Sequence, residues 1–145
     1  MKMFSKKRDE ENYVRNVTDM AKEVVEMYSE TIGVRFENTT ELERQIIAVY
    51  VFGMADGVRQ NSEVEIPHVK IISTFVAALN IVFEYSIEQA QTFAYNITKS
   101  LQERDDSDTY VAIVHRGLDG YLLWQQNKKR EVINDILAIV NVLKR

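Results

Sequence analysis

Two histidines are the side chains of this 145-residue chain best suited to acid–base or metal chemistry. His115 is followed one helical turn later by Asp119, a spacing that puts both side chains on one face of a helix. Such a pair could act as a general base and its orienting carboxylate, or it could simply lie hydrogen-bonded at the margin of a core. His68 follows Pro67 at a helix start, where positive charge is disfavoured, so we expect a neutral, exposed imidazole there.

These residues do not make up a complete catalytic or metal site. A zinc site takes three or more protein ligands at matched spacing, whereas His115 and Asp119 supply at most two. Asp56 could complete such a set only from another helix across the bundle. The absence of cysteine excludes a disulfide framework, a thiolate metal site and a cysteine nucleophile. We therefore expect no enzyme activity, no catalytic residue, no bound metal and no cofactor.

Composition also narrows the classes of partner. A net charge of −4 argues against a surface that neutralises nucleic-acid phosphates, because such surfaces need clustered lysine and arginine. The basic tract at residues 128–130 is followed at once by Glu131 and suits a solvated helix start. A basic or neutral protein is the expected partner, and nucleic acid is not.

The spacing of apolar residues predicts helices throughout. The chain has one proline and five glycines, and its apolar residues recur three or four positions apart. Thr40 with Glu43 and Ser86 with Gln89 are capping-box pairs at two helix starts. Ser107 or Asp108 can cap a later helix. The sequence therefore predicts an all-α fold, a single compact bundle of about six helices near residues 9–30, 40–60, 67–83, 86–101, 108–126 and 132–143, with the very apolar third helix at its centre.

Length indicates one domain spanning residues 1–145. Residues 1–8 carry four cations but no following apolar stretch, so we expect a disordered N-terminal tail and not a secretory signal. The longest apolar stretch, residues 71–83, is shorter than the roughly 20 residues that cross a bilayer. We expect a cytoplasmic protein with no membrane contact. Since the core uses up the apolar stripes, a monomer or weak homodimer is expected.

Two helices share an Asp-Gly dipeptide. Asp56-Gly57 in the second predicted helix and Asp119-Gly120 in the fifth stand at matching points. One interpretation is a close helix crossing, in which small residues let two backbones approach while each aspartate lies near a helix end or an arginine. The other is a shared polar patch with a function.

One stretch resembles a known family. The segment Ile113-Val114-His115-Arg116-Gly117-Leu118-Asp119-Gly120-Tyr121, continuing to Trp124-Gln125, resembles the His-Arg-Gly-hydrophobic-Asp-Gly stretch of the immunity protein 48 family. Phe52-Gly53-Met54 and Phe83-Glu84-Tyr85-Ser86-Ile87-Glu88-Gln89-Ala90 are also similar to that family. Together the three stretches lie within residues 46–126, and the one around His115 is the most specific.

The resemblance implies a helical bacterial immunity protein of a polymorphic toxin system. Such a protein binds and neutralises a cognate toxin domain by direct contact, without turnover. The residues then expected on the toxin-binding surface are Asp56, Arg59, His115, Arg116, Asp119, Tyr121 and Trp124. Two alternatives stay open: a small regulatory module that seats a metal or ligand between the Asp56 and His115 helices, and a hydrolase with His115 as base.

Overall fold

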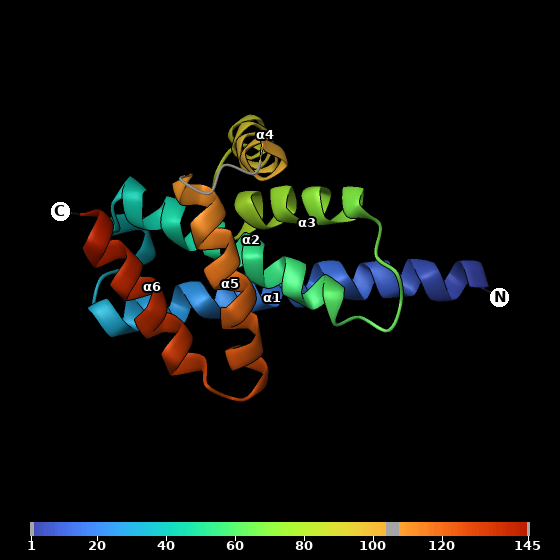
Figure 1. Ribbon diagram of the computed structural model, residues 1–145, viewed down its shortest axis with the longest axis horizontal. Helices are drawn as coiled ribbons and strands as arrows, with labels where there is room; N and C mark the ends of the chain where they lie inside the picture. The colour runs from blue at the N-terminus through green and yellow to red at the C-terminus, as the bar shows by residue number, and fades with distance from the viewer. Residues whose placement is uncertain (1, 104–107, 145) are drawn as a thin grey trace.

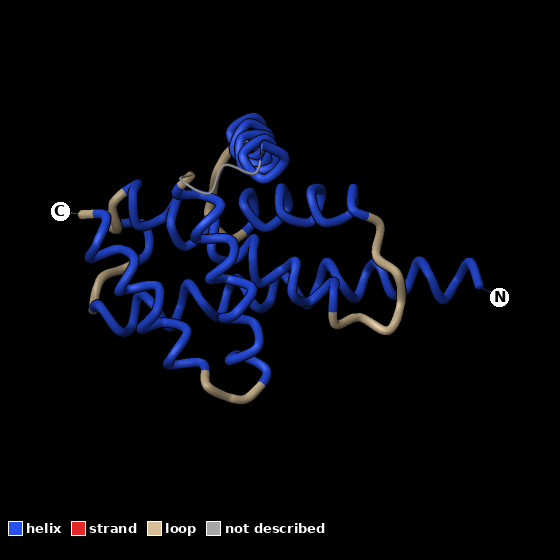
Figure 2. The backbone as a smooth tube through the Cα atoms, in the orientation of Figure 1, coloured by secondary structure: helices blue, strands red, loops and turns tan. Residues whose placement is uncertain are grey.

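The computed structural model describes the chain over residues 2–103 and 108–144. These residues form helices without any strand, as Figure 2 shows, so the prediction of an all-α fold with about six helices is confirmed. In the same residues no helix combines the length and the apolar character needed to cross a membrane. The elements are α1 (Lys2–Ile32), a 3₁₀ helix η1 (Phe36–Asn38), α2 (Glu41–Gln60), α3 (His68–Ile81), α4 (Ile87–Glu103), α5 (Thr109–Gln125) and α6 (Lys129–Leu143).

Helix α2 is the centre of the bundle. Every residue over positions 46–55 is buried, and α2 packs against α1, α3, α5 and α6. In the view of Figure 1, α5 and α6 pass across α1, and α4 is seen nearly end-on above α3. The expectation that the third helix is central was wrong: α3 leaves Val69 and Ile81 exposed at 72% and 61%. Positions 46–55 form an unbroken stretch of apolar or small residues, so this part of α2 can be enclosed on all sides, whereas α3 packs against α1, α2 and α4 and leaves one side open.

The predicted caps are present. Thr40 Oγ1 accepts from the Glu43 amide at 3.1 Å while the Thr40 amide donates to Glu43 Oε1 at 3.0 Å. Ser86 and Gln89 form the same reciprocal pair, at 3.1 and 3.0 Å. Asp108 caps α5 by accepting from the Tyr110 amide, whereas Ser107 lies outside the described residues. These local contacts place the starts of α2, α4 and α5 where the sequence predicts them.

Helix ends depart from the expectations in two places. The predicted disordered tail over residues 1–8 is helical from Lys2, because no proline or glycine interrupts the chain before Gly33. Helix α3 ends at Ile81, two residues before the expected residue 83. Glu84 adopts a left-handed φ of 63°, which ends the helical path and turns the chain toward α4.

The helices α2 and α5 cross with their backbones in contact. A Cβ atom built on Gly53 would lie 2.1 Å from the Val114 carbonyl oxygen, and one on Gly117 would lie 2.2 Å from the Tyr50 carbonyl oxygen. A Cβ atom on Gly57 would lie 2.7 Å from the ring of Tyr121 on α5. No side chain larger than hydrogen fits at these positions, so the interpretation of the glycines as helix-crossing residues is confirmed.

A buried carboxylate joins α1 to the start of α2. The Tyr28 hydroxyl donates to Glu43 Oε2, and the same carboxylate accepts from Thr40. Burial alone would raise the pKa of the Glu43 carboxyl, but the hydrogen bonds from Tyr28 and Thr40 and the charge of Lys144 hold it below its usual value. Glu43 is therefore an ionised acceptor that both caps α2 and fixes Tyr28.

Adding one methyl group at the crossing should test its importance. We expect Gly53→Ala to lower the free energy of unfolding by about 1–3 kcal/mol, because the new Cβ would overlap a backbone oxygen that cannot move alone. In an open helix the same change would stabilise by about 0.5–1 kcal/mol. Urea denaturation followed by circular dichroism measures the difference, and a stabilised variant would contradict the close crossing.

The depressed pKa of Glu43 makes a prediction about acid stability. A carboxyl with a lower pKa in the folded chain contributes stability above its unfolded pKa of about 4.3, and this contribution disappears as the pH falls through the folded value. The stability difference between the wild type and Glu43→Gln should therefore be largest near pH 7 and shrink in acid. The exposed Glu30→Gln change on α1 is the control. A Glu43 difference that stayed constant down to pH 3 would contradict the assignment.

Candidate functional site

The His-Arg-Gly-hydrophobic-Asp-Gly segment lies in the middle of α5 and is divided by the crossing. Gly117 and Gly120 face α2, where Gly120 lies against the Tyr50 hydroxyl. Successive helical positions point 100° apart, so His115 and Asp119 project away from α2, and both are exposed. Leu122 continues the same face with 58% of its surface exposed. We call Ala112, His115, Asp119 and Leu122 the outer face of α5.

Arg116 is held by α6. Its guanidinium forms an ion pair with Asp135 Oδ1, and the Tyr50 hydroxyl donates to Asp135 Oδ2 at 3.0 Å. Burial, then the charge and hydrogen bond of Asp135, raise the pKa of Tyr50, so that its hydroxyl stays a donor. This network connects α2, α5 and α6, and it leaves about half of the Arg116 side chain exposed beside the outer face of α5.

The two predicted aromatic contacts lie further inside. Tyr121 is 7% exposed, packs on Gly57 and accepts a hydrogen bond from the Gln125 amide. Trp124 is half-buried beneath Lys129, whose Nζ lies 4.9 Å from the ring centroid. The same Nζ lies 2.7 Å from Glu23 Oε1 on α1. In the folded chain Tyr121 is a core residue, and Trp124 helps fasten the α5–α6 turn to α1.

Asp56 and Arg59 pair with each other on α2. Arg59 Nε donates to Asp56 Oδ1 at 3.0 Å, and Gln60 Nε2 donates to Asp56 Oδ2 at 3.1 Å. Both members of the ion pair are less than one-third exposed. Asp56 therefore has both carboxylate oxygens occupied within its own helix, as the structural interpretation of the Asp-Gly dipeptides requires.

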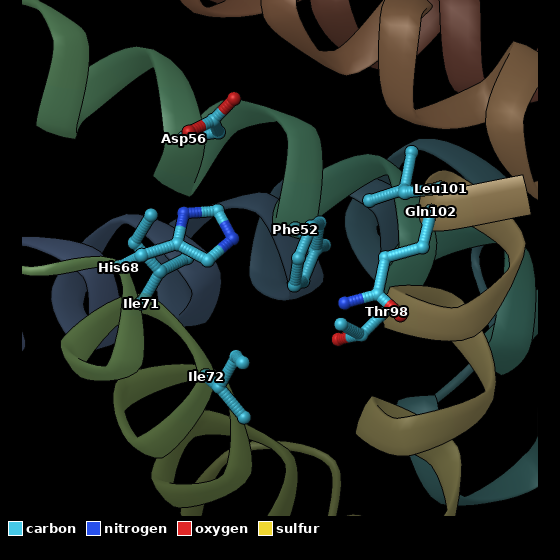
Figure 3. Close-up of a pocket in the computed structure, with 8 residues that line it drawn as sticks. All are labelled: Phe52, Asp56, His68, Ile71, Ile72, Thr98, Leu101 and Gln102. Carbon is cyan, nitrogen blue, oxygen red and sulfur yellow. The ribbon is translucent and has the colours of Figure 1, made fainter. Parts of the chain in front are cut away.

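Figure 3 shows a cleft of about 410 Å³ between α2, α3 and α4. Asp56 and His68 lie on one side, and Thr98 and Gln102 of α4 lie on the other. The apolar lining comes from Phe52, Ile71, Ile72 and Leu101. Local spacing in the sequence does not predict this cleft, because its lining comes from three helices whose crossing geometry depends on the tertiary structure.

The two aspartates of the Asp-Gly dipeptides line different clefts. Asp119 lines a second one, of about 400 Å³, with Gly57, Leu118 and Leu122 between the end of α2 and α5. Asp56 lines the cleft of Figure 3. The glycines of the two dipeptides, Gly57 and Gly120, lie against Tyr121 and Tyr50 across the helix crossing, whereas the two carboxylates line separate clefts.

The geometry of the histidines bears on catalysis and metal binding. Among the described residues no hydrogen bond or ion pair joins His115 to Asp119, and both side chains are exposed. Within those residues no three histidine, aspartate or glutamate side chains come close enough together to hold a metal ion. The outer face of α5 is open to solvent at His115, and its Asp119 and Leu122 border the cleft between α2 and α5. This arrangement is suited to contact with another protein.

Comparison with known proteins gives one match. The family model described as Immunity protein 48 matches residues 17–144, which include the C-terminal half of α1 and all the other helices. No curated protein and no solved structure matches the chain. The matched region contains the outer face of α5 and the clefts described above.

The ion pair on α5 predicts different effects for two adjacent residues. We expect Arg116→Ala to lower the free energy of unfolding by about 1 kcal/mol, because it removes a partly exposed ion pair in a network. His115→Ala should change it by less than about 0.5 kcal/mol, because His115 is exposed and forms no ion pair or hydrogen bond with another described side chain. Urea denaturation measures both. Equal effects would contradict the assignment of Arg116 to the α5–α6 connection.

Proposed function

The chain belongs to the immunity protein 48 family, and from this membership we propose that it binds a cognate toxin protein and neutralises it by direct contact. The observation that carries the proposal is the family match over residues 17–144. The match spans the core of the bundle, so the fold and the proposed function concern the same unit. We further propose a bacterial polymorphic toxin system, with the immunity protein acting in the cytoplasm of the cell it protects.

The outer face of α5 is the proposed toxin-binding surface. It presents His115 and Asp119 with the apolar Leu122, and Arg116 borders it. Interfaces combine an apolar centre with polar groups around it, and arginine is frequent among their strongest contacts. The proposed toxin-binding residues also include four beside the outer face of α5: Tyr121 and Trp124, which belong to α5 itself, and the Asp56–Arg59 pair on α2.

Neutralisation is proposed to occur by binding without catalysis. A rigid surface loses little conformational entropy when a partner docks, and α5 is fixed by its glycine crossing with α2 and by the Arg116–Asp135 ion pair. The net charge of −4 would speed encounter with a basic toxin. We propose that the protein acts as a monomer or weak homodimer and does not bind nucleic acid.

The cleft of Figure 3 favours one other candidate function. Its volume of about 410 Å³ falls in the range of small-ligand sites, and polar groups face each other across an apolar base. A regulatory module that binds a small ligand there, with no toxin partner, is the second candidate. Unlike toxin binding, ligand binding in this cleft would not depend on the outer face of α5.

Co-expression with the toxin domain encoded beside this chain tests the first proposal. We expect the wild type to restore growth and to co-purify with the toxin. The double variant His115→Ala, Asp119→Ala should fold normally yet bind the toxin more than about tenfold less tightly, because it truncates two contacts at the centre of the surface.

A matched pair of exposed residues provides the control. Asn16→Ala with Asp19→Ala removes an amide and a carboxylate from α1, away from α5, and should leave rescue and affinity unchanged. Cell death with no complex would refute the immunity function. Rescue that survives the α5 double variant would retain the function and move the binding surface elsewhere.

A further inference from the structure

A third groove, about 480 Å³ in volume, lies between the start of α2, the α3–α4 turn, α4 and the start of α5. Its lining joins two carboxylates with three aromatic rings and several uncharged polar side chains, and contains no lysine, arginine or histidine. Arg44 lies beside the lining as the one cation among the described partners of Glu41, with which it forms an ion pair of 3.0 Å. The lining residues are Glu41, Gln45, Tyr85, Glu88, Gln89, Thr92, Phe93, Asn96 and Tyr110.

The aromatic rings form a continuous row along the groove. The centroids of Tyr85 and Phe93 lie 6.0 Å apart, and those of Phe93 and Tyr110 lie 6.2 Å apart. The three rings come from the α3–α4 turn, α4 and α5, so only the folded bundle assembles them. An aromatic face attracts a cation through its quadrupole, and arginine stacks on such faces as well as carrying charge.

The walls of the groove are held in place. The Tyr85 hydroxyl donates to Glu41 Oε1 at 2.9 Å, and Asn80 Nδ2 donates to the Tyr85 carbonyl at 2.9 Å. The Ser86–Gln89 capping pair fixes the first turn of α4, which carries Glu88. A site whose side chains are already ordered has less entropy to lose when a ligand binds.

The two carboxylates differ in what they can still bind. Burial would raise the pKa of Glu41, but hydrogen bonds from Tyr85, Arg44 and Gln45 lower it, so Glu41 is ionised and already paired. Glu88 is exposed and has no ion-pair or hydrogen-bond partner among the described side chains. Glu88 is thus the acceptor left for an incoming cation. The cleft of Figure 3 lacks this feature, because its carboxylate is paired with Arg59.

We propose that this groove binds an arginine side chain presented by the toxin, with the guanidinium stacked on the Tyr85–Phe93–Tyr110 row and hydrogen-bonded to Glu88. The inference rests on the proposed function for the identity of the partner. It adds a second contact surface to the outer face of α5 and a requirement on the toxin, which must project a cationic side chain. The binding of the guanidinium itself depends only on the groove.

The affinity of the groove can be measured without the toxin. The probe is N-acetyl-arginine methylamide, titrated into the full chain while side-chain amide and aromatic NMR signals are followed, with the citrulline analogue as an uncharged isostere. We expect saturable shifts at Tyr85, Phe93 and Tyr110 for arginine and not for citrulline. Equal shifts with citrulline, or no saturable shifts, would overturn the site.

Two glutamates provide a matched pair of variants. Glu88 and Glu131 are both exposed and both lie in the first turn of a helix, α4 and α6 respectively. Glu88→Gln should abolish the arginine-induced shifts, whereas Glu131→Gln should leave them intact. Because both positions are exposed, neither change should lower the unfolding midpoint. Shifts that survive Glu88→Gln would refute the role of this carboxylate.

The same variants measured against the adjacent toxin domain separate the two proposals. If the wild type binds the toxin, Glu88→Gln should weaken binding about tenfold, the size of one lost charge-assisted contact, and Glu131→Gln should not. Toxin binding that is indifferent to Glu88→Gln would overturn the groove as a toxin contact while the immunity function stands. No toxin binding by the wild type would refute both the immunity function and the assignment of the partner, even if the arginine probe binds.

Discussion

The helices α2 and α5 touch backbone to backbone, and this contact sets the position of α5 in the bundle. Gly53 and Gly117 let the two helices approach until each meets a carbonyl oxygen of the other. A helix pair this close cannot rotate or slide without a clash, because the contacting atoms are backbone and have no rotamers to adjust. Since α2 is also the helix buried on every side, fixing α5 against it fixes the position of α5 relative to the whole bundle.

This contact also decides which side chains reach solvent. With Gly117 and Gly120 turned toward α2, His115 and Asp119 must point outward. The same segment of α5 therefore contains both the glycines that contact α2 and the polar residues of the outer face of α5. Arg116 belongs to both, because its charge is tied to Asp135 while half of its side chain stays accessible.

The groove lined by Glu41, Glu88 and three aromatic rings depends on the same placement of α5 across α2. Tyr110 starts α5 and meets Phe93 of α4 only because α5 is held across α2, with α4 resting on α3. The turn at Glu84 then brings Tyr85 to Glu41 at the start of α2. Two proposed contact surfaces thus sit on one rigid frame, and a partner that used both would bind without reshaping the bundle.

The helices and their caps could be predicted from the sequence, because helical period and capping depend on residues within four positions of each other. The Thr40–Glu43 and Ser86–Gln89 caps were predicted in this way, whereas a close glycine crossing was one of two interpretations and its Gly53–Gly117 contact was not predicted. The folded bundle was needed to show that α2 and not α3 is central, that Tyr121 is buried, and that Arg116 pairs with Asp135. The groove that contains Glu88 could also be found only in the folded structure, since its lining comes from three helices and a turn. These outcomes depend on how helices far apart in the chain are placed against each other, and local spacing carries no information on that placement.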